Sequence, residues 1–124
     1  MDEPGQILRK LAIGDDALLH RVLADARAGH PDFSSLDAKT HALVCVAALI
    51  AMDAAEPSYL WAVDAARAAG ASDEELVGCL LAAMPVLGVA RVVCAAPKLG
   101  LALGYDVGAA LEDAGVAAGQ TGGR

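Results

Sequence analysis

The chain of 124 residues is long enough for one ordinary domain with its own hydrophobic core, and its formal net charge is −7. That charge disfavours binding to the phosphate backbone of nucleic acids and to anionic lipid surfaces, so we expect neither a nucleic acid nor a membrane as a partner. Hydrophobic residues make up 56% of the sequence and aromatic residues only 3%, so alanine, leucine and valine must fill the interior. So many apolar residues in so short a chain predict a subunit interface, and we expect a homo-oligomer.

The sequence also bears on cellular location. The start of the chain lacks the charged segment and short apolar stretch that are typical of a secretory signal. The longest uncharged stretch, Leu76 to Ala90, is shorter than the roughly 18 residues that a membrane span needs. We therefore expect a cytoplasmic protein.

The three cysteines, Cys45, Cys79 and Cys94, stand singly, and none has a partner at the spacing of a catalytic dithiol. Each lies among alanine, valine and leucine residues, which is typical of small hydrophobic core residues in a reducing compartment. We expect all three thiols to react only after denaturation. Dithiol-dependent peroxide reduction is excluded on the same ground.

Apolar residues at helical spacing predict two helices in the first part of the chain. The first runs over 6–13 and ends at Gly14, and the second is amphipathic and runs from Asp15 to Gly29. The composition of 28–35 favours a loop.

A longer helix is predicted from about Ser35 to Asp53. Ser35 and Asp37 offer oxygen acceptors at its start, and the residues of 43–52 are apolar on almost every face. This helix is expected to be central to the fold. After the break at 54–55, another helix begins at Glu56 and ends at Gly70.

The last helices are marked by caps and glycines. Ser72 and Glu75 form a capping-box pattern that opens one helix, and the region of Pro85 and Gly88 is expected to bend or interrupt it. A final helix is predicted over 89–103. Its glycines recur every four residues in 100–108 and would allow another backbone to approach closely. We expect an all-α domain over 1–114 and a disordered tail over 115–124.

Several short motifs fall at the helix boundaries between Leu36 and Leu103. They are Leu36-Asp37-Ala38-Lys39-Thr40 before the apolar helix, Ala68-Ala69-Gly70-Ala71 at the end of the next helix, Ser72-Asp73-Glu74-Glu75-Leu76 at the start of another, and Leu87-Gly88-Val89. This pattern resembles the carboxymuconolactone decarboxylase family, which includes the alkyl hydroperoxidase D-like proteins. The resemblance implies a compact all-helical domain that assembles as trimers or hexamers, with any active site near a subunit interface.

The catalytic residues that this resemblance implies are missing from the sequence. The positions of the redox cysteine pair fall on Ala55 and Ser58, that of the histidine on Ala62 and that of the glutamate on Ala42. Redox chemistry at these positions needs a stabilised thiolate, a base and a second thiol, which alanine and serine cannot supply. The decarboxylase branch is affected too, because it resembles an enzyme that uses the same histidine to move a proton.

Polar and aromatic residues nevertheless gather where the family's site opens. Glu56 is a candidate proton donor or acceptor, and Ser58, Tyr59 and Trp61 are candidates for binding a substrate. The alternatives are that Glu56 complements the positive end of a helix and that the two aromatic residues fill a core or a dimer interface.

His41 is the second candidate acid or base, because Asp37 lies four residues before it and can share its helix face. A surface ion pair is the alternative. Arg67 and Arg91 are candidates for binding a carboxylate-bearing ligand at an interface, or else belong to solvated helix faces. No histidine has the spacing of a metal site, so we expect neither a metal nor another cofactor.

Two hypotheses about function follow. In the first, the chain is a carboxymuconolactone decarboxylase-like enzyme of lyase type that acts on a small, mostly apolar organic molecule by acid/base chemistry at a subunit interface. In the second, it is a non-catalytic oligomeric binding or scaffold protein derived from that family. The sequence leaves both open.

Overall fold

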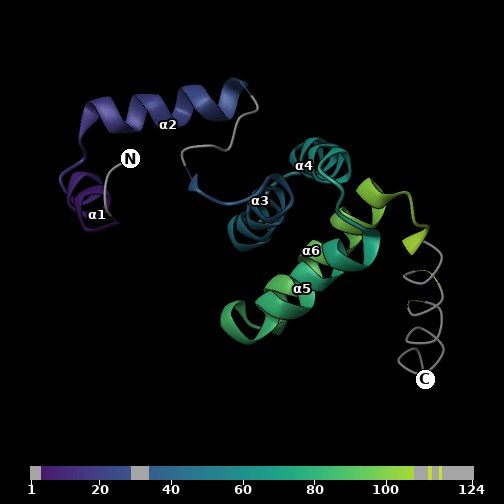
Figure 1. The fold of residues 1–124 in the computed structure, drawn as a ribbon. Coiled ribbons are helices and arrows are strands. Elements are labelled where there is room, and N and C mark those ends of the chain that lie inside the picture. The colour runs from purple at the N-terminus through teal and green to yellow at the C-terminus, as the bar shows by residue number, and fades with distance from the viewer. Residues whose placement is uncertain (1–3, 29–33, 108–111, 113–114, 116–124) are drawn as a thin grey trace. The chain divides into compact units, whose positions relative to one another are not determined.

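The computed structural model describes residues 4–28, 34–107, 112 and 115 (Figure 1). The regular elements in this part of the chain are all α-helices, which confirms the predicted fold class. None of the described helices is long and apolar enough to cross a membrane. The chain divides into two compact units, Met1–His41 and Ala42–Arg124, which are described separately. Of the predicted tail, only Gly115 lies among the described residues.

The N-terminal unit contains α1 (Pro4–Ala12) and α2 (Asp16–Ala28), which pack against each other. Gly14 follows α1 with a φ of 68°, in the left-handed region that favours glycine. The Oδ2 atom of Asp15 then accepts a hydrogen bond of 3.0 Å from the backbone N–H of Leu18. Both helices lie close to their predicted bounds, and most of the loop predicted over 28–35 lies outside the described residues.

The next helix, α3 (Ala38–Met52), carries no Asp, Glu, Lys or Arg after Lys39. It buries Ala42, Val46 and Ile50, which lie four residues apart and so form one face of the helix. Val44 and Met52 are exposed in the single chain. The helix predicted to be central is therefore buried on one face only and leaves apolar surface in contact with solvent.

Three helices complete the C-terminal unit: α4 (Glu56–Ala68), α5 (Asp73–Leu87) and α6 (Val89–Leu103). The predicted capping box is confirmed, since Ser72 Oγ accepts from the N–H of Glu75 at 3.1 Å and Glu75 Oε1 accepts from the N–H of Ser72 at 2.9 Å. Pro85 stays inside α5. The interruption lies at Gly88, whose φ of 92° separates α5 from α6.

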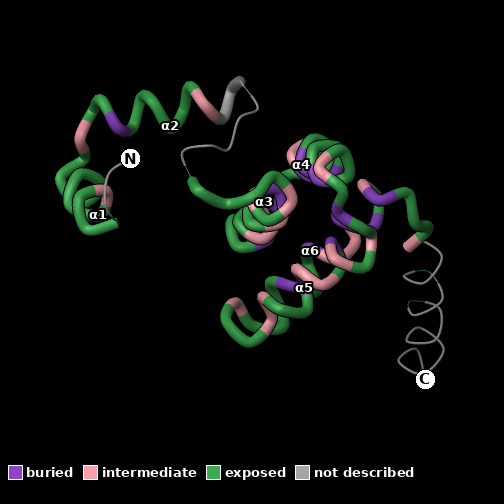
Figure 2. Tube along the Cα trace, viewed as in Figure 1, coloured by how far each residue is buried: buried purple, intermediate pink, exposed green. Residues whose placement is uncertain are grey.

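The core of this unit forms where α6 packs against both α4 and α5, joined by the buried face of α3 (Figure 2). Its fully buried members include Tyr59, Leu76 and Leu99. The buried residues of α6 follow helical spacing and are Val92, Ala95, Leu99, Gly100 and Leu103. Arg91, Cys94 and Lys98 are not among these buried residues and lie outside the core face of α6.

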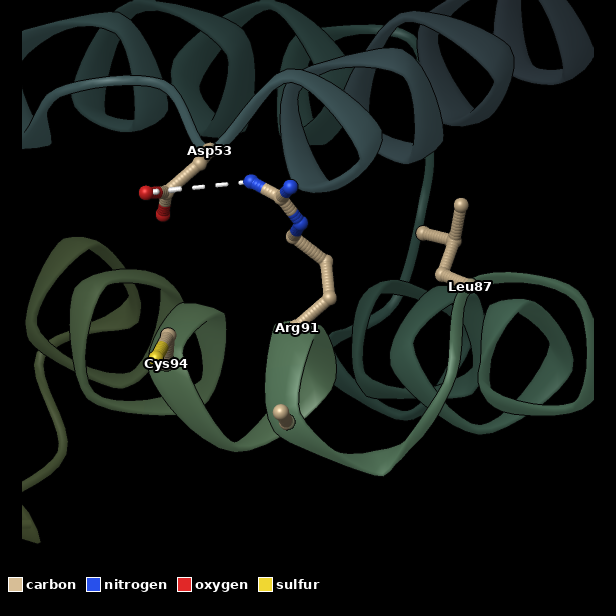
Figure 3. Close-up of a pocket in the computed structure, with 5 residues that line it drawn as sticks. Asp53, Leu87, Arg91 and Cys94 are labelled. Carbon is tan, nitrogen blue, oxygen red and sulfur yellow. Dashed lines mark ion pairs between the residues drawn. The ribbon is translucent and has the colours of Figure 1, made fainter.

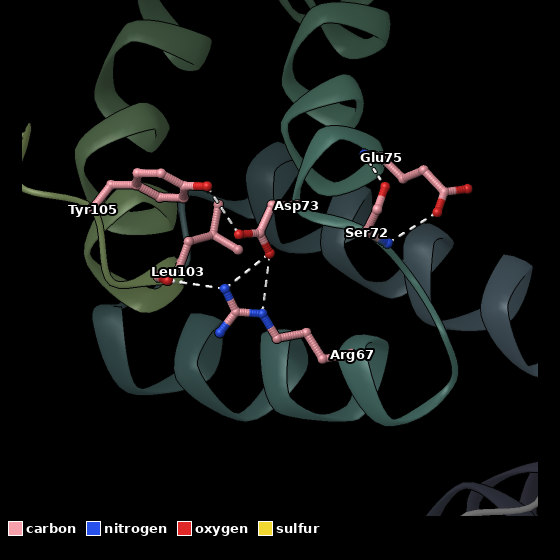
Figure 4. A network of polar contacts seen from close by, with 6 residues as sticks. All are labelled: Arg67, Ser72, Asp73, Glu75, Leu103 and Tyr105. Carbon is pink, nitrogen blue, oxygen red and sulfur yellow. Dashed lines mark hydrogen bonds and ion pairs between the residues drawn. The ribbon is translucent and has the colours of Figure 1, made fainter.

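A network of polar contacts joins α4, α5 and the end of α6 (Figure 4). The Arg67 guanidinium donates to Asp73 Oδ1 from Nε at 3.1 Å and from Nη2 at 2.9 Å, and Nη2 also donates to the carbonyl oxygen of Leu103 at 2.9 Å. The Tyr105 hydroxyl donates to Asp73 Oδ2 at 3.0 Å. Arg67 is therefore more than part of a solvated face, because its Nε and Nη2 groups bind the chain itself, and its role in binding a ligand stays a prediction.

This network predicts a pH dependence of stability. The Arg67 hydrogen bonds, followed by the Tyr105 hydrogen bond, lower the pKa of Asp73 below its ordinary value of 3.8. The stabilisation is therefore fully present above pH 3.8 and is lost as the pH falls through the lowered pKa. In urea unfolding, Asp73→Asn should reduce stability at pH 7, and its difference from the wild type should shrink in acid. A difference that stays constant between neutral pH and pH 2 would contradict this assignment.

The glycines of 100–108 do not share one role. Gly100 is buried, and a Cβ atom there would lie 2.7 Å from Cγ1 of Val107 in the same chain. Gly104 has a φ of 93° and ends α6. At Gly100 the close neighbour is thus a side chain of the same chain and not another backbone, and Gly108 lies outside the described residues.

Candidate functional site

An open cavity of about 380 Å³ lies in the C-terminal unit, between the end of α3, the end of α5 and the first half of α6 (Figure 3). We call it the Arg91 cavity. Its lining residues are Asp53, Leu87, Ala90, Arg91 and Cys94. This volume falls within the range of small-molecule sites, and the lining combines apolar side chains with a few charged groups, as such sites do.

Asp53 has two cationic neighbours at unequal distances. Lys98 Nζ lies 3.0 Å from Asp53 Oδ1 and also donates to the carbonyl oxygen of Ala54 at 3.1 Å. Arg91 Nη1 is 3.8 Å from Asp53 Oδ2, which is beyond hydrogen-bond distance (Figure 3). The hydrogen bond from Lys98, together with the charge of Lys98, lowers the pKa of Asp53 below its ordinary value. The carboxylate is thus hydrogen-bonded by Lys98, while the Arg91 guanidinium at the cavity forms only the longer ion pair with it and no hydrogen bond within the described part of the chain.

The backbone at Asp53 takes the left-handed conformation that glycine adopts most readily. The backbone N–H of Asp53 donates to the carbonyl oxygen of Ile50 at 3.2 Å, and the N–H of Ala54 donates to the carbonyl oxygen of Leu49 at 3.1 Å. These two hydrogen bonds form the Schellman motif of a helix end. Asp53 takes the left-handed position of this motif with a φ of 54°.

The same pair of bonds ends α1, α4 and α6, where the left-handed residue is glycine: Gly14, Gly70 and Gly104. A side chain at this position costs about 1 kcal/mol relative to glycine. Among the helix ends that show this motif in the described chain, the end of α3 alone carries a carboxylate, and that carboxylate lines the cavity. Strain of this kind is typical of positions kept for function.

The position of Cys94 corrects one expectation. Cys94 is exposed and lines the Arg91 cavity, so the prediction that all three thiols are shielded until denaturation is wrong for this residue. Cys45 and Cys79 are partly buried, and burial raises the pKa of the Cys79 thiol. On α6 the buried positions are 92, 95 and 99, so residue 94 falls outside the core face even though its neighbours in sequence are apolar.

The candidate residues of α4 do not point to one place. Glu56 is exposed in the first turn of the helix, and Ser58 is partly buried. Tyr59 is completely buried in the core, whereas the Trp61 side chain is 70% exposed. Residues two apart on a helix lie on nearly opposite sides, so the two aromatic rings cannot line one wall of a pocket within a single chain.

Tyr59 has an unusual hydroxyl. Its oxygen is buried and has no hydrogen-bond partner among the described residues. Burial raises the pKa of the phenol, the negative charge of Asp53 raises it further, and the positive charge of Arg91 lowers it. The phenol is thus a core residue within electrostatic reach of the two charged groups of the cavity.

His41 lies in the first turns of α3 and belongs to the N-terminal unit. The residue is partly buried, and its backbone N–H donates to the carbonyl oxygen of Asp37 at 2.9 Å. Its role as an acid or base, like that of Glu56, stays a prediction.

Arg91 is the predicted binding residue that lies at the cavity, and Asp53 and Lys98 were not predicted with it. A helical pattern could have indicated Lys98, because residues seven apart lie on the same side of a helix, and Arg91 and Lys98 are the charged residues of α6. The contact of both with Asp53 depends on how α6 packs and has no signature in the sequence.

The described residues contain no group of three or more His, Cys, Asp or Glu side chains that could hold a metal ion. Comparisons of the chain with protein-family models, with curated proteins and with solved structures gave no match.

Proposed function

We propose that this chain binds a small, mostly apolar organic acid in the Arg91 cavity, as a divergent carboxymuconolactone decarboxylase-like protein without redox thiols. The unequal ion pairing of Asp53 carries the proposal. Lys98 holds the carboxylate at 3.0 Å, while Arg91 stands 3.8 Å away and keeps its donors for another group. A guanidinium binds a carboxylate through two parallel hydrogen bonds, which makes an organic acid its natural ligand.

The surroundings of Arg91 support the same class of ligand. Two cations and one carboxylate leave an excess of one positive charge at the cavity, in a chain whose net charge is −7. Leu87, Ala90 and Cys94 offer apolar surface to the rest of the molecule. A monocarboxylate with a short hydrocarbon chain satisfies both the charge and the lining.

Cys94 provides a direct test, because its exposed thiol lines the cavity. We expect hexanoate to slow the alkylation of Cys94 by iodoacetamide, measured by peptide mapping, while the uncharged analogue hexanamide has a weaker effect. Cys79, which is partly buried outside the cavity lining, serves as the internal control and should react at the same rate with and without hexanoate. Equal alkylation of Cys94 at every hexanoate concentration would contradict the proposal.

The exposed side of α6 supports assembly of the chain into a homo-oligomer. Val89, Val93 and Leu101 are exposed at spacings of four and eight residues, so they form one apolar stripe along the helix. A surface helix of a monomer ordinarily carries charged residues on its solvent side. We propose that this stripe is buried between subunits, in a trimer or hexamer such as the family resemblance implies.

Val93→Glu tests this interface, because a charge in an apolar contact must lose its water. We expect light scattering coupled to gel filtration to show a smaller assembly than the wild type, with the helix content by circular dichroism unchanged. Asp64→Lys, an exposed charge change on α4, is the matched control and should leave the mass unchanged. A wild-type mass equal to one chain would contradict the oligomer outright.

Acid/base conversion of the bound acid is the second candidate function. Glu56 favours it, because this exposed carboxylate in the first turn of α4 follows the cavity-lining Asp53 by three residues. With an organic acid that the wild type converts, Glu56→Gln should abolish turnover and leave the oligomer intact. Unchanged turnover in this variant would remove Glu56 from the chemistry, and binding without any conversion would favour the non-catalytic alternative.

A further inference from the structure

We infer that Lys98 is a positioning residue, which keeps Arg91 available for an anionic ligand by holding Asp53 away from it. The inference rests on the proposed function, since it explains how the cavity keeps a free guanidinium beside a carboxylate. It assigns Lys98 a role in the affinity of the site although Lys98 is not among the residues that line the cavity.

Lys98 and Arg91 compete for the carboxylate of Asp53. They lie seven residues apart on α6 and reach different oxygens of Asp53, Lys98 at 3.0 Å to Oδ1 and Arg91 at 3.8 Å to Oδ2. A guanidinium this close to a carboxylate needs only a small side-chain movement to bind it directly. In that state its donors would be occupied and the anion site would be closed.

Lys98 is held by two hydrogen bonds to the connection after α3, one to a side chain and one to the backbone. Its ammonium group donates to Asp53 and also to the carbonyl oxygen of Ala54. These two bonds fix the ammonium between α3 and α6 and direct the carboxylate toward it. The Lys98 side chain is less exposed than that of Arg91, at 27% against 42%, which agrees with an anchored and an available cation.

Asp53 can be changed to asparagine without altering the backbone at the end of α3. The carboxylate stands at a left-handed position that the ends of α1, α4 and α6 give to glycine. Asparagine, like aspartate, tolerates this conformation, so Asp53→Asn removes the charge without changing the backbone requirement. This makes Asp53→Asn the partner variant for Lys98→Met.

The experiment compares Lys98→Met, Asp53→Asn and the double variant with the wild type, using two measurements. The first is the rate at which phenylglyoxal modifies Arg91 without ligand, followed by peptide mapping. The second is the affinity for hexanoate from NMR titration. Lys98→Met should slow the modification of Arg91 and weaken hexanoate binding about five- to tenfold, because Asp53 then pairs with Arg91.

Asp53→Asn should act in the opposite direction, and the double variant should recover at least the wild-type affinity. A merely structural role for Lys98 predicts no such rescue, since removing both partners would then weaken the site further. Lys98→Arg should stay closer to the wild type than Lys98→Met does.

The two proposals can fail separately. Unchanged modification of Arg91 in Lys98→Met, or a double variant as weak as Lys98→Met, would overturn the positioning role. Slower modification in Lys98→Met together with no hexanoate binding by the wild type would uphold the positioning role and overturn the proposed ligand.

Discussion

Arg91→Met is expected to weaken the binding of hexanoate by about 10- to 100-fold, because a hydrogen-bonded pair of charges contributes about 1.5–3 kcal/mol. The variant removes the guanidinium that stands 3.8 Å from Asp53 and keeps a side chain of similar length. Isothermal calorimetry or NMR titration measures the change. The apolar contacts of the cavity remain, so the loss should fall on the charged ligand.

Two comparisons isolate the charge of Arg91 from its packing. Hexanamide has the same chain as hexanoate without the charge, and its binding should change by less than about twofold in Arg91→Met. Arg91→Lys keeps the charge and loses the planar pair of donors, so its affinity for hexanoate should lie between those of the wild type and Arg91→Met. Equal losses for hexanoate and hexanamide would mean that Arg91 supports the cavity wall only.

Leu99→Ala is expected to lower the free energy of unfolding by about 3 kcal/mol, because it leaves a cavity at the contact of α6 with the core. The Leu99 side chain has no exposed surface, and it is among the largest fully buried side chains of the chain's described part. The melting temperature should fall by about 10 °C or more for a chain of this size. Urea unfolding at neutral pH measures the free energy directly.

Leu60→Ala is the matched control for Leu99→Ala. Leu60 is half exposed on α4, so the same truncation there should change stability by about 0.5 kcal/mol or less. Similar losses in the two variants would contradict the buried position of Leu99 and hence the packing of α6.

The fold could be predicted largely from local chemistry. Ser72 and Glu75 determine the start of α5 through contacts three residues apart, and Gly88 determines its end through its own backbone preference. Such features act within a few residues and are therefore visible in the sequence. Pro85 was less informative, because α5 continues past it to Leu87.

The burial of α3 could be predicted only in part. Its residues are apolar on nearly every side, which is the pattern of a helix surrounded by partners. In the single chain one face meets the core and Val44 and Met52 remain exposed. In the proposed oligomer, these exposed residues of α3 would be available for contact with another subunit.

Residues that are neighbours in the sequence do not form the candidate site. Glu56, Tyr59 and Trp61 are close in the sequence, but the turn of α4 sends Tyr59 into the core and Trp61 to the surface. Asp53 and Lys98, 45 residues apart, meet at 3.0 Å because the end of α3 comes close to α6 at this point. A contact between two helix positions this distant is decided by packing, which no local motif records.

A comparison of the helix ends within the chain singles out Asp53. Several helices end on a glycine in the left-handed conformation, whereas α3 ends on aspartate with a φ of 54°. A residue that keeps a carboxylate where glycine would relieve strain is a candidate for function. The sequence shows the aspartate, but the backbone conformation that gives it meaning comes from the structure.

The most direct test of the central claim is a crystal structure of the chain with hexanoate bound. We predict the carboxylate of the ligand within hydrogen-bond distance of the Arg91 guanidinium, its hydrocarbon chain against Leu87 and Ala90, and the contact between Lys98 and Asp53 intact. A ligand bound elsewhere, for example beside Glu56 and Trp61 with the Arg91 cavity empty, would contradict the account.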